Sequence, residues 1–419
     1  MRDSLQFARQ CDLDDSLSHF REQFYFPKDE NGKNLIYLCG NSLGLQPKTA
    51  QQYIGQELKD WSEHGVRGHT QAKAPWIPYH ELLTKTMAAV VGAKPSEVVI
   101  MNTLTANLHL MMVSFYRPTK TKYKIVITGD AFPSDRYAVE SQLKFHGFDP
   151  KESLVLWEPR EGEKTCRFED LEKIMAEQGG TIALLMVGSP NYYTGQHFPL
   201  QKITQLGHRH NCKVGFDLAH GAGNIQPNLH ATGPDFAVWC SYKYLNSGPG
   251  SLGGCFVHER HAKDSALNRF AGWWGHNKQT RFNMRRTFDP LPGAEGWQLS
   301  NPPILSMAAI RASLDIFAKA GFDKLREKSE KLTGYLEFLL DKLGDENITI
   351  ITPRNKAERG CQLSMHVKNA NRELHAQLTE TDVVSDWRGP DVIRVAPVPL
   401  YNSFTDVHLF VNRLKMALK

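Results

Sequence analysis

A lysine follows directly after a strand-like apolar run near the middle of the chain. Residues 237–241 read Ala-Val-Trp-Cys-Ser, and Tyr242 and Lys243 come next, before a glycine-rich turn. A lysine just past a buried strand lies in partly dry surroundings, which favour the neutral amine. A neutral amine can attack a carbonyl carbon and form a Schiff base. The plain alternative is a loop lysine in solvent, and two further patterns weigh against it.

The first of these patterns is an acid at the end of another predicted strand. Residues 213–217 read Lys-Val-Gly-Phe-Asp, and His220 follows three residues after Asp217. An acid beside a Schiff-base lysine indicates pyridoxal phosphate, because the carboxylate keeps the ring nitrogen protonated and makes the ring an electron sink. His220 could bond this carboxylate or lie over the ring. The plain alternative for Asp217 is a helix N-cap.

The second pattern is a strand, a tight turn and a helix at residues 98–111. Leu104 and Thr105 stand at the predicted start of the helix. Free N–H groups and the helix dipole favour a phosphate at such a start. Taken alone this signal is weak, because any capped helix begins in the same way. The order of phosphate turn, ring acid and lysine along the chain is far more specific than any one of them.

A fourth short segment follows the predicted strand 124–128. It reads Phe132-Pro133-Ser134-Asp135. Phe132 could stack on a pyridine ring, whereas Ser134 and Asp135 could bond its substituents or the phosphate. A tight turn with a core phenylalanine is the plain alternative.

Apolar strand-like runs alternate with helical patterns through the middle of the chain. This alternation predicts an α/β fold with a mostly parallel, seven-stranded sheet and helices on both faces. Ligands of such sheets bind beyond the carboxyl ends of the strands, where Thr105, Phe132, Asp217 and Lys243 all fall. The predicted strands are 98–101, 124–128, 154–157, 181–187, 213–217, 236–240 and 254–258.

The pattern changes near residue 306, where long amphipathic helices precede short strands. We therefore expect three parts. Residues 1–60 form an N-terminal segment that packs on the small domain, 61–305 form a large cofactor-binding domain, and 306–419 form a small C-terminal α+β domain. The expected division follows from the change in periodicity.

Several motifs together resemble kynureninase, a family of pyridoxal-phosphate enzymes with the type I aminotransferase fold. The resemblance runs through most of the chain, and general type I enzymes share the lysine and the ring acid without the whole set. The segments that carry it are 37–44 (Tyr-Leu-Cys-Gly-Asn-Ser-Leu-Gly), 132–135, 192–195 (Tyr-Tyr-Thr-Gly), 272–276 (Gly-Trp-Trp-Gly-His), 300–303 (Ser-Asn-Pro-Pro) and 394–397 (Arg-Val-Ala-Pro).

The resemblance implies hydrolysis of the Cβ–Cγ bond of L-kynurenine or 3-hydroxy-L-kynurenine. The products are an anthranilate and L-alanine, a step of tryptophan degradation towards NAD precursors. Lys243 would form the Schiff base and move protons, Asp217 would hold the ring nitrogen, and Tyr242 would bond the phosphate and help to protonate Cβ. An aminotransferase or a cysteine desulfurase is the alternative enzyme. A catalytically silent binding protein of this fold is the alternative outside enzymes, and the intact Lys243 and Asp217 argue against it.

Arg394 is the expected ligand of the substrate carboxylate. It lies in the apolar run 392–396, where a guanidinium needs a partner and a carboxylate matches its fork. The structural alternative is a pair with an acid such as Asp391. Arg388 is expected in a surface turn. Ser300 completes the substrate contacts that the resemblance implies.

The remaining expected contacts involve the predicted loop at residues 65–70 and a second subunit. His64 aligns best with a histidine that packs on the aromatic ring of the substrate, and His69 competes with it. In similar enzymes Trp273 contacts the cofactor phosphate from the neighbouring subunit, and Asn301 also approaches across the dimer. We therefore expect a homodimer with sites completed in trans.

The composition argues against several other classes of protein. Fifty basic residues stand against forty-five acidic ones, and the bases are scattered, so no nucleic-acid partner is expected. No apolar run is long enough for a membrane span, and the polar N-terminus lacks a signal core, so cytoplasmic residence is expected. The seven widely spaced cysteines are typical of reduced thiols.

No metal site is expected from the histidine-rich segments. His208 and His210 point to different sides of a predicted helix. His258 and His261 lack an acidic or thiol partner at ligand spacing in the sequence.

Overall fold

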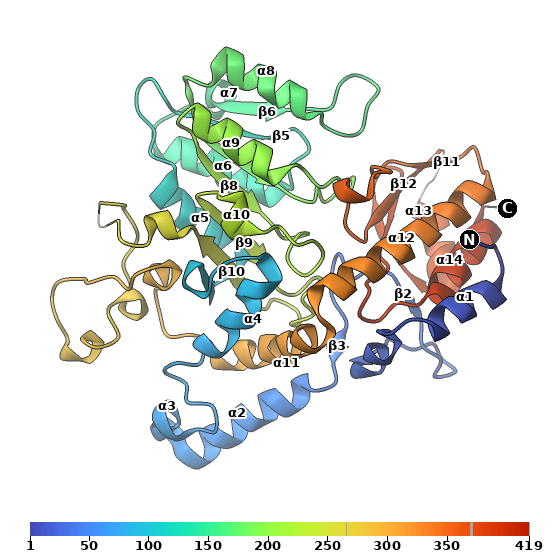
Figure 1. Cartoon of the computed structure of the whole chain (residues 1–419), viewed down its shortest axis with the longest axis horizontal. Helices are drawn as coiled ribbons and strands as arrows, with labels where there is room; N and C mark the ends of the chain where they lie inside the picture. Colours follow the sequence, from blue (N-terminus) through green and yellow to red (C-terminus); the bar gives the residue numbers. More distant parts are fainter. Residues whose placement is uncertain (265, 369–371, 419) are drawn as a thin grey trace.

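A seven-stranded sheet lies at the centre of the larger part of the molecule (Figure 1). The computed structural model describes residues 1–264, 266–368 and 372–418. The strand order is β4-β10-β9-β8-β7-β5-β6. Neighbours from β9 to β6 are parallel, whereas β10 runs antiparallel to both β9 and β4. The strands are β4 Val98–Met101, β5 Lys124–Thr128, β6 Leu154–Trp157, β7 Ile182–Gly188, β8 Lys213–Asp217, β9 Phe236–Cys240 and β10 Gly253–Val257.

Helices connect these strands and cover both faces of the sheet. Their bounds are α4 Glu81–Val91, α5 Leu104–Phe115, α6 Pro133–Phe145, α7 Pro150–Ser153, α8 Phe168–Gln178, α9 Leu200–Arg209 and α10 Leu229–Thr232. Successive strand residues point to opposite faces. In β5, Val126 packs in one apolar core with residues of α4, α8 and α9, whereas Ile125 and Ile127 pack in another with residues of α5 and α6. The predicted mostly parallel, seven-stranded sheet with helices on both faces is therefore confirmed.

A smaller antiparallel sheet belongs to the C-terminal part, with the order β11-β12-β15-β14. Its apolar side packs with α12, α13, α14 and α1 in a third core. Arg388 lies in β14 and not in a surface turn as predicted, because its strand is only three residues long and gives little signal in the sequence. The bounds are β11 Ile348–Ile350, β12 Leu363–Val367, β14 Asp386–Arg388, β15 Val392–Val395, α12 Phe322–Leu343, α13 Arg372–Glu380, α14 Phe404–Ala417 and α1 Leu5–Leu13.

The N-terminal residues lie against this smaller sheet. The strand β2 (Ile36–Tyr37) pairs in parallel with β13 (Val383–Val384), and β1 (Phe24–Tyr25) pairs with β3 (Gln46–Pro47). The helix α11 (Ile304–Ala320) packs on α4 and on α2 (Ala50–His64). The division at residues 60 and 305 stays a prediction.

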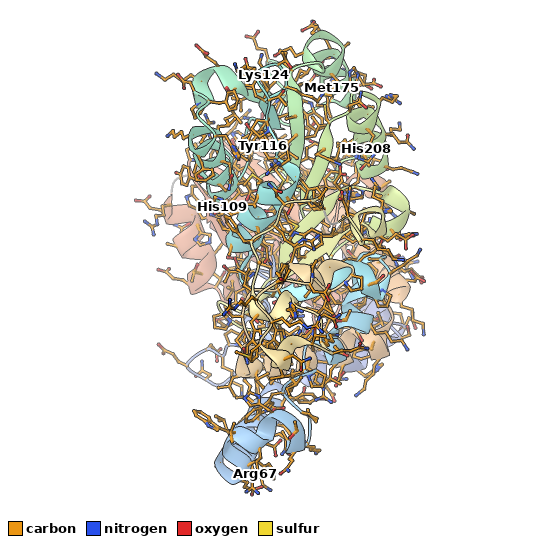
Figure 2. The ribbon with its side chains drawn as sticks, turned by 90° about the vertical axis from the view of Figure 1, so that its left-hand side faces the viewer. Arg67, His109, Tyr116, Lys124, Met175 and His208 are labelled. Atoms are coloured by element: carbon orange, nitrogen blue, oxygen red, sulfur yellow. The ribbon has the colours of Figure 1, made fainter. Side chains whose placement is uncertain are left out.

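The helices α2 and α3 (Gly68–Gln71) form an arm that extends from the rest of the chain (Figure 1). Arg67 lies at its tip in Figure 2. Trp61 and Val66 on this arm are 62% and 79% exposed, which is unusual for large apolar side chains and marks a surface that another molecule could cover.

The rest of the chain shows two further features. None of the described helices combines the length and the apolar character that a membrane crossing requires. All seven cysteines are free thiols in the structure, as the sequence predicts, and five of them are buried.

Candidate active site

A cavity opens beyond the carboxyl ends of the parallel strands. Each of β4, β5, β7, β8 and β9 is followed by residues that line it, so the sheet topology alone brings distant segments together. The lining residues are Leu104, Thr105, Thr128, Ala131, Phe132, Ser134, Asp135, Gly188, Pro190, Asn191, Tyr192, Asp217, Ala219, His220, Tyr242 and Lys243.

Lys243 lies in the cavity on a tightly held backbone. Its Nζ atom is 5.9 Å from the centre of the Phe132 ring and 6.0 Å from that of Tyr242. The backbone N–H of Gly44 donates to the Tyr242 carbonyl oxygen at 2.9 Å. A β-carbon at Gly44 would lie 2.2 Å from the carbonyl oxygen of Lys243, so only glycine fits there. The segment 37–44 thus fixes the lysine loop from outside.

Two buried carboxyl groups meet beside the lysine. The side chains of Asp135 and Asp217 share a hydrogen bond, and Asp217 Oδ1 also accepts the N–H of Ala219 at 2.6 Å. Burial raises the pKa of both groups, the nearby carboxylate raises that of Asp135 further, and Lys243 acts in the opposite direction. Burial and the neighbouring carboxylate thus favour the protonated form of Asp135. Asp135 Oδ1 is buried and has no hydrogen-bond partner in the described part of the chain.

Two helices begin at the same end of the cavity. Neither the N-cap residue of α5, Thr103, nor that of α6, Phe132, caps its helix with a side chain. Among the described hydrogen bonds, the backbone N–H groups of Thr105 in α5 and Ser134 in α6 have no partner and can bind an anion. In α6 the N–H of Asp135 already donates to the carbonyl oxygen of Phe132 at 2.9 Å. The hydroxyl groups of Thr105 and Ser134 lie 2.8 Å apart between them. Pro133 begins α6 and does not line the cavity.

His220 and Tyr242 lie in the cavity as neutral groups. Burial, and then the charge of Lys243, lowers the pKa of His220 well below its usual range. The hydrogen bond of this imidazole goes to Gln362, whereas no bond joins it to Asp217 among the described contacts. Burial and the neighbouring thiol of Cys240, which bonds the phenol, raise the pKa of Tyr242. Tyr242 therefore keeps its proton at neutral pH.

Arg394 lies behind one wall of the cavity. It is 1% exposed, its Nη1 donates to the carbonyl oxygen of Tyr192, and its Nη2 pairs with Asp386. Arg394 therefore pairs with an acid, as the structural alternative expects, but this acid is Asp386 and not Asp391, which lies 3.0 Å from His366. The Nε atom of Arg394 is buried and has no hydrogen-bond partner among the described residues. Its guanidinium lies 5.9 Å from the centre of the Tyr192 ring, which lines the cavity.

The other expected site residues lie outside this cavity in the single chain. Trp273 is 44% exposed, and Ser300 and Asn301 are exposed as well. His64 ends α2 on the arm, and the ring of His69 lies 5.4 Å from that of Trp76. These side chains lie in regions that a second chain could cover.

The sequence interpretation overlooked part of the cavity wall. The Tyr192 ring meets the Phe132 ring edge to face at 5.3 Å. Asn191 donates to Asp130 at 2.9 Å, which joins the loops after β7 and β5. Tyr192 belongs to the motif at 192–195, which could have indicated it. No comparable signal joins Asn191 to Asp130.

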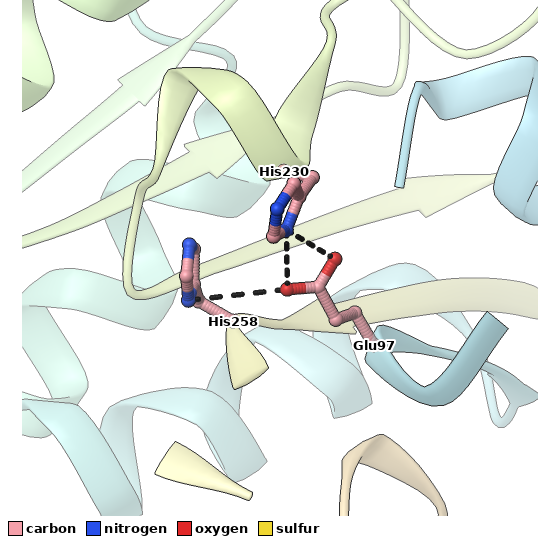
Figure 3. Close-up of side chains that lie close together, drawn as sticks. All are labelled: Glu97, His230 and His258. Atoms are coloured by element: carbon pink, nitrogen blue, oxygen red, sulfur yellow. Dashed lines mark hydrogen bonds and ion pairs between the residues drawn. The ribbon is translucent and has the colours of Figure 1, made fainter. Parts of the chain in front are cut away.

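The interpretation of the histidine-rich segments was wrong about acidic partners. His258 Nδ1 lies 3.9 Å from Glu97, and His261 Nε2 lies 2.8 Å from Asp235. Figure 3 shows Glu97 between His258 and His230. These acids come from other segments of the chain, so spacing within the sequence could not reveal them.

Comparison with known proteins shows the family of this chain. Residues 325–414 match the model of the kynureninase C-terminal domain. Kynureninase from Myxococcus xanthus is 58% identical over 99% of this chain and 97% of that protein. Kynureninase from Nematostella vectensis is 47% identical, again over 99% of this chain and over 94% of its own length.

Solved structures show the same fold at low sequence identity. A mutant of C-DES with glycine covalently linked to its pyridoxal-phosphate cofactor has a TM-score of 0.78 and 17% identity, covering 94% of this chain and 98% of that one. A cysteine desulfurase from Escherichia coli has a TM-score of 0.76 and 16% identity, covering 96% and 98%. With the full-length matches to its curated relatives, these observations establish that the chain belongs to the kynureninase family.

Proposed function

We propose that this chain is a pyridoxal-phosphate-dependent hydrolase that cleaves the Cβ–Cγ bond of L-kynurenine or 3-hydroxy-L-kynurenine. The products are anthranilate or 3-hydroxyanthranilate and L-alanine. The observation that carries the proposal is the cavity itself, in which Lys243 faces a buried carboxyl pair and two open helix N-termini. The kynureninase relatives support the choice of reaction.

The cavity fits pyridoxal phosphate on three separate points. The N-termini of α5 and α6, with Thr105 and Ser134, offer N–H and hydroxyl donors to a phosphate. The buried carboxylate of Asp217 suits a protonated ring nitrogen, which would give it the positive partner that a buried charge needs. Lys243 supplies the amine for a Schiff base. When bound, the cofactor supplies an electron sink that weakens bonds at the substrate Cα.

The side chains of the cavity hold and move the protons of the reaction. Lys243 removes the proton from the substrate Cα, and Tyr242, a neutral phenol, protonates Cβ after the Cβ–Cγ bond breaks. Water adds to the γ-carbonyl carbon before that bond breaks. Asp135 shares its proton with Asp217 and so limits the negative charge beside the ring. His220 packs as a neutral ring in the same cavity.

Arg394 and the aromatic wall would orient the substrate. The guanidinium is fixed by Asp386 and by the Tyr192 carbonyl oxygen, and its Nε remains free to donate to the substrate carboxylate. The Phe132 and Tyr192 rings form apolar walls that suit the aryl group of kynurenine. A cysteine desulfurase would need a cysteine within reach, and no cysteine is among the residues that line this cavity.

We also propose a homodimer in which each site is completed in trans. Trp273, Phe282 and Met284 are 44%, 57% and 76% exposed, and the arm carries exposed Trp61 and Val66. Apolar side chains of this size are typical of a covered interface. In such a dimer Trp273, Ser300, Asn301 and either His64 or His69 would reach the cavity of the partner. The seven free thiols support cytoplasmic residence.

Two experiments test this function. Borohydride reduction followed by peptide mapping should place the cofactor on the peptide that contains Lys243, and the visible absorption band should bleach. Addition of kynurenine should then produce anthranilate fluorescence in the unreduced protein. A protein that keeps the cofactor on another residue, or forms no anthranilate, would contradict the proposal.

A further inference from the structure

A carboxylate and two imidazoles meet at one end of the strands of the large sheet, and the Lys243 cavity lies at the opposite end of these strands (Figure 3). Glu97 ends the short helix before β4, His230 lies in α10, and His258 follows β10. The antiparallel pairing places the end of β10 beside the beginnings of β9 and β4. The cavity lies beyond the opposite ends of the parallel strands, so the cluster is separate from the active site.

The three side chains point to one small volume. His230 Nδ1 lies 3.0 Å and 3.2 Å from the two carboxylate oxygens of Glu97, and His258 Nδ1 lies 3.9 Å from Oε1. One ligand atom from each residue lies within 4.8 Å of the others. Ligands of a tetrahedral zinc ion at about 2.0–2.1 Å are roughly 3.3 Å apart. Small shifts of the two rings would therefore bring all three atoms to bonding distance of one ion.

Glu97 is a buried anion without a strong cation beside it. It is 0% exposed, and its oxygens accept the backbone N–H groups of Lys94 and Glu259, each at 2.9 Å. Its ion-pair contacts in the described part of the chain go to the two histidines alone. A buried carboxylate is stable when a positive charge accompanies it.

A neighbouring cluster shows how this fold neutralises a similar acid. Asp235 is buried and contacts His208 at 3.0 Å and His261 at 2.8 Å. The ammonium of Lys213 lies 3.1 Å from the same carboxylate and provides the positive charge. Glu97 has two imidazoles in the same way but has no such lysine. A cation bound beside Glu97 would take the place that Lys213 has beside Asp235.

The donor atoms are suited to a metal ion. His258 Nδ1 carries a lone pair, which accepts the N–H of Arg260 at 3.1 Å, and an ion would replace this hydrogen bond. His230 Nδ1 faces carboxylate oxygens and therefore carries a proton, which an ion would displace. The side chains of His230 and His258 are 36% and 14% exposed. An ion can thus enter from solvent and keep a water ligand.

We propose that Glu97, His230 and His258 bind one zinc ion through two imidazole nitrogens and one carboxylate oxygen, with water as the remaining ligand. Two histidines and a glutamate form a donor set that zinc prefers. The ion would join the segment before β4, the helix α10 and the segment after β10. Because it binds the folded chain, it stabilises this edge of the sheet and takes no part in the chemistry at Lys243.

The test measures zinc binding to the full-length protein with its cofactor. The protein is treated with a chelator, dialysed, and titrated with zinc by calorimetry, and its Tm is followed at increasing zinc. The variants are Glu97→Gln, His230→Ala and His258→Ala. His208→Ala is the matched control, because His208 is 35% exposed and also pairs with a buried carboxylate. We expect one zinc per wild-type chain and a Tm that rises with zinc.

The zinc affinities of the variants distinguish a specific zinc site from adventitious binding. Each of the three ligand substitutions should weaken zinc binding by at least about tenfold, as is common when a metal site is perturbed. His208→Ala should bind zinc as the wild type does. Absence of zinc binding to the wild type would overturn the proposal. Zinc affinities in His230→Ala and His258→Ala that equal the wild-type affinity would mean an adventitious ion only and would overturn it as well. His230 is partly exposed, so its variant decides the question even if Glu97→Gln does not fold.

Discussion

Replacement of Arg394 by alanine should lower kcat/KM for the substrate strongly and should destabilise the fold only modestly. Its guanidinium is held by Asp386 and by the carbonyl oxygen of Tyr192, and its Nε has no partner among the described residues. A charge-assisted pair with the substrate carboxylate contributes about 2–4 kcal/mol. Each step of about 1.4 kcal/mol is tenfold, so kcat/KM for kynurenine should fall about 30- to 1,000-fold.

The control for this prediction is Arg388→Ala. Arg388 also pairs with Asp386, at 3.1 Å, but has no contact with Tyr192 among the described hydrogen bonds. Its loss should change kcat/KM by much less than the loss of Arg394. Arg394→Lys should recover only part of the activity, because an ammonium cannot bond Asp386, the Tyr192 carbonyl oxygen and the substrate carboxylate in the same planar geometry. The visible absorption of the cofactor without substrate should stay unchanged in all three variants.

The assay is steady-state kynurenine turnover, with Tm measured on the same samples. Removal of Arg394 leaves Asp386 with Arg388 as its remaining partner, so a modest fall in Tm is expected. A large fall in Tm together with normal kcat/KM in the folded fraction would refute the substrate role. Arg394 would then be a structural partner of Asp386.

Three further predictions follow from the same contacts. Asp217→Asn should weaken cofactor binding about 10- to 150-fold, from the 1.5–3 kcal/mol of a bond to a charged group, and a normal Kd would contradict it. Inactive Lys243→Ala and Trp273→Ala chains should regain partial activity when mixed, and a strictly monomeric, active protein in sedimentation would exclude this. Burial lowers the pKa of His197 from 6.5 to about 4. Between these pH values the histidine is protonated in the unfolded chain and neutral in the folded chain. The free energy of unfolding should therefore fall as pH drops from 6.5 towards 4, by on the order of 2 kcal/mol, and denaturant unfolding of His197→Gln should show less of this loss.

The central sheet and the cavity could be predicted because each rests on a local pattern. The apolar runs of β8 and β9 are bounded clearly, and Asp217 and Lys243 stand at or just past their ends. The rule that ligands bind beyond the carboxyl ends of parallel strands then brings both residues to one place. No knowledge of side-chain contacts is needed for that step.

The partner of Arg394 could not be predicted because it depends on the register between strands. Asp386 and Arg394 are cross-strand neighbours in β14 and β15. A strand of three residues has no clear periodicity, so the nearer acid Asp391 was the more evident candidate. The hydrogen bond between Asp135 and Asp217 could not be predicted for a similar reason. It forms only when two segments that are distant in the sequence are buried together.

The contacts of Glu97 illustrate the limit of sequence spacing most clearly. Its two histidines come from segments far along the chain. His258 reaches it because β10 runs antiparallel to β9 and β4, and His230 reaches it from α10, which precedes β9. His64, Trp273 and Asn301 lie outside the cavity, so the contacts expected of them depend on a second chain.

The stoichiometry of the products tests the central claim most directly. Wild-type protein with pyridoxal phosphate should convert kynurenine into equal amounts of anthranilate and alanine, and Lys243→Ala should form neither. Hydrolysis at Cβ–Cγ requires both products from one substrate molecule. Loss of the substrate amino group without release of anthranilate would indicate an aminotransferase, and full activity of Lys243→Ala would contradict the assignment of the active site.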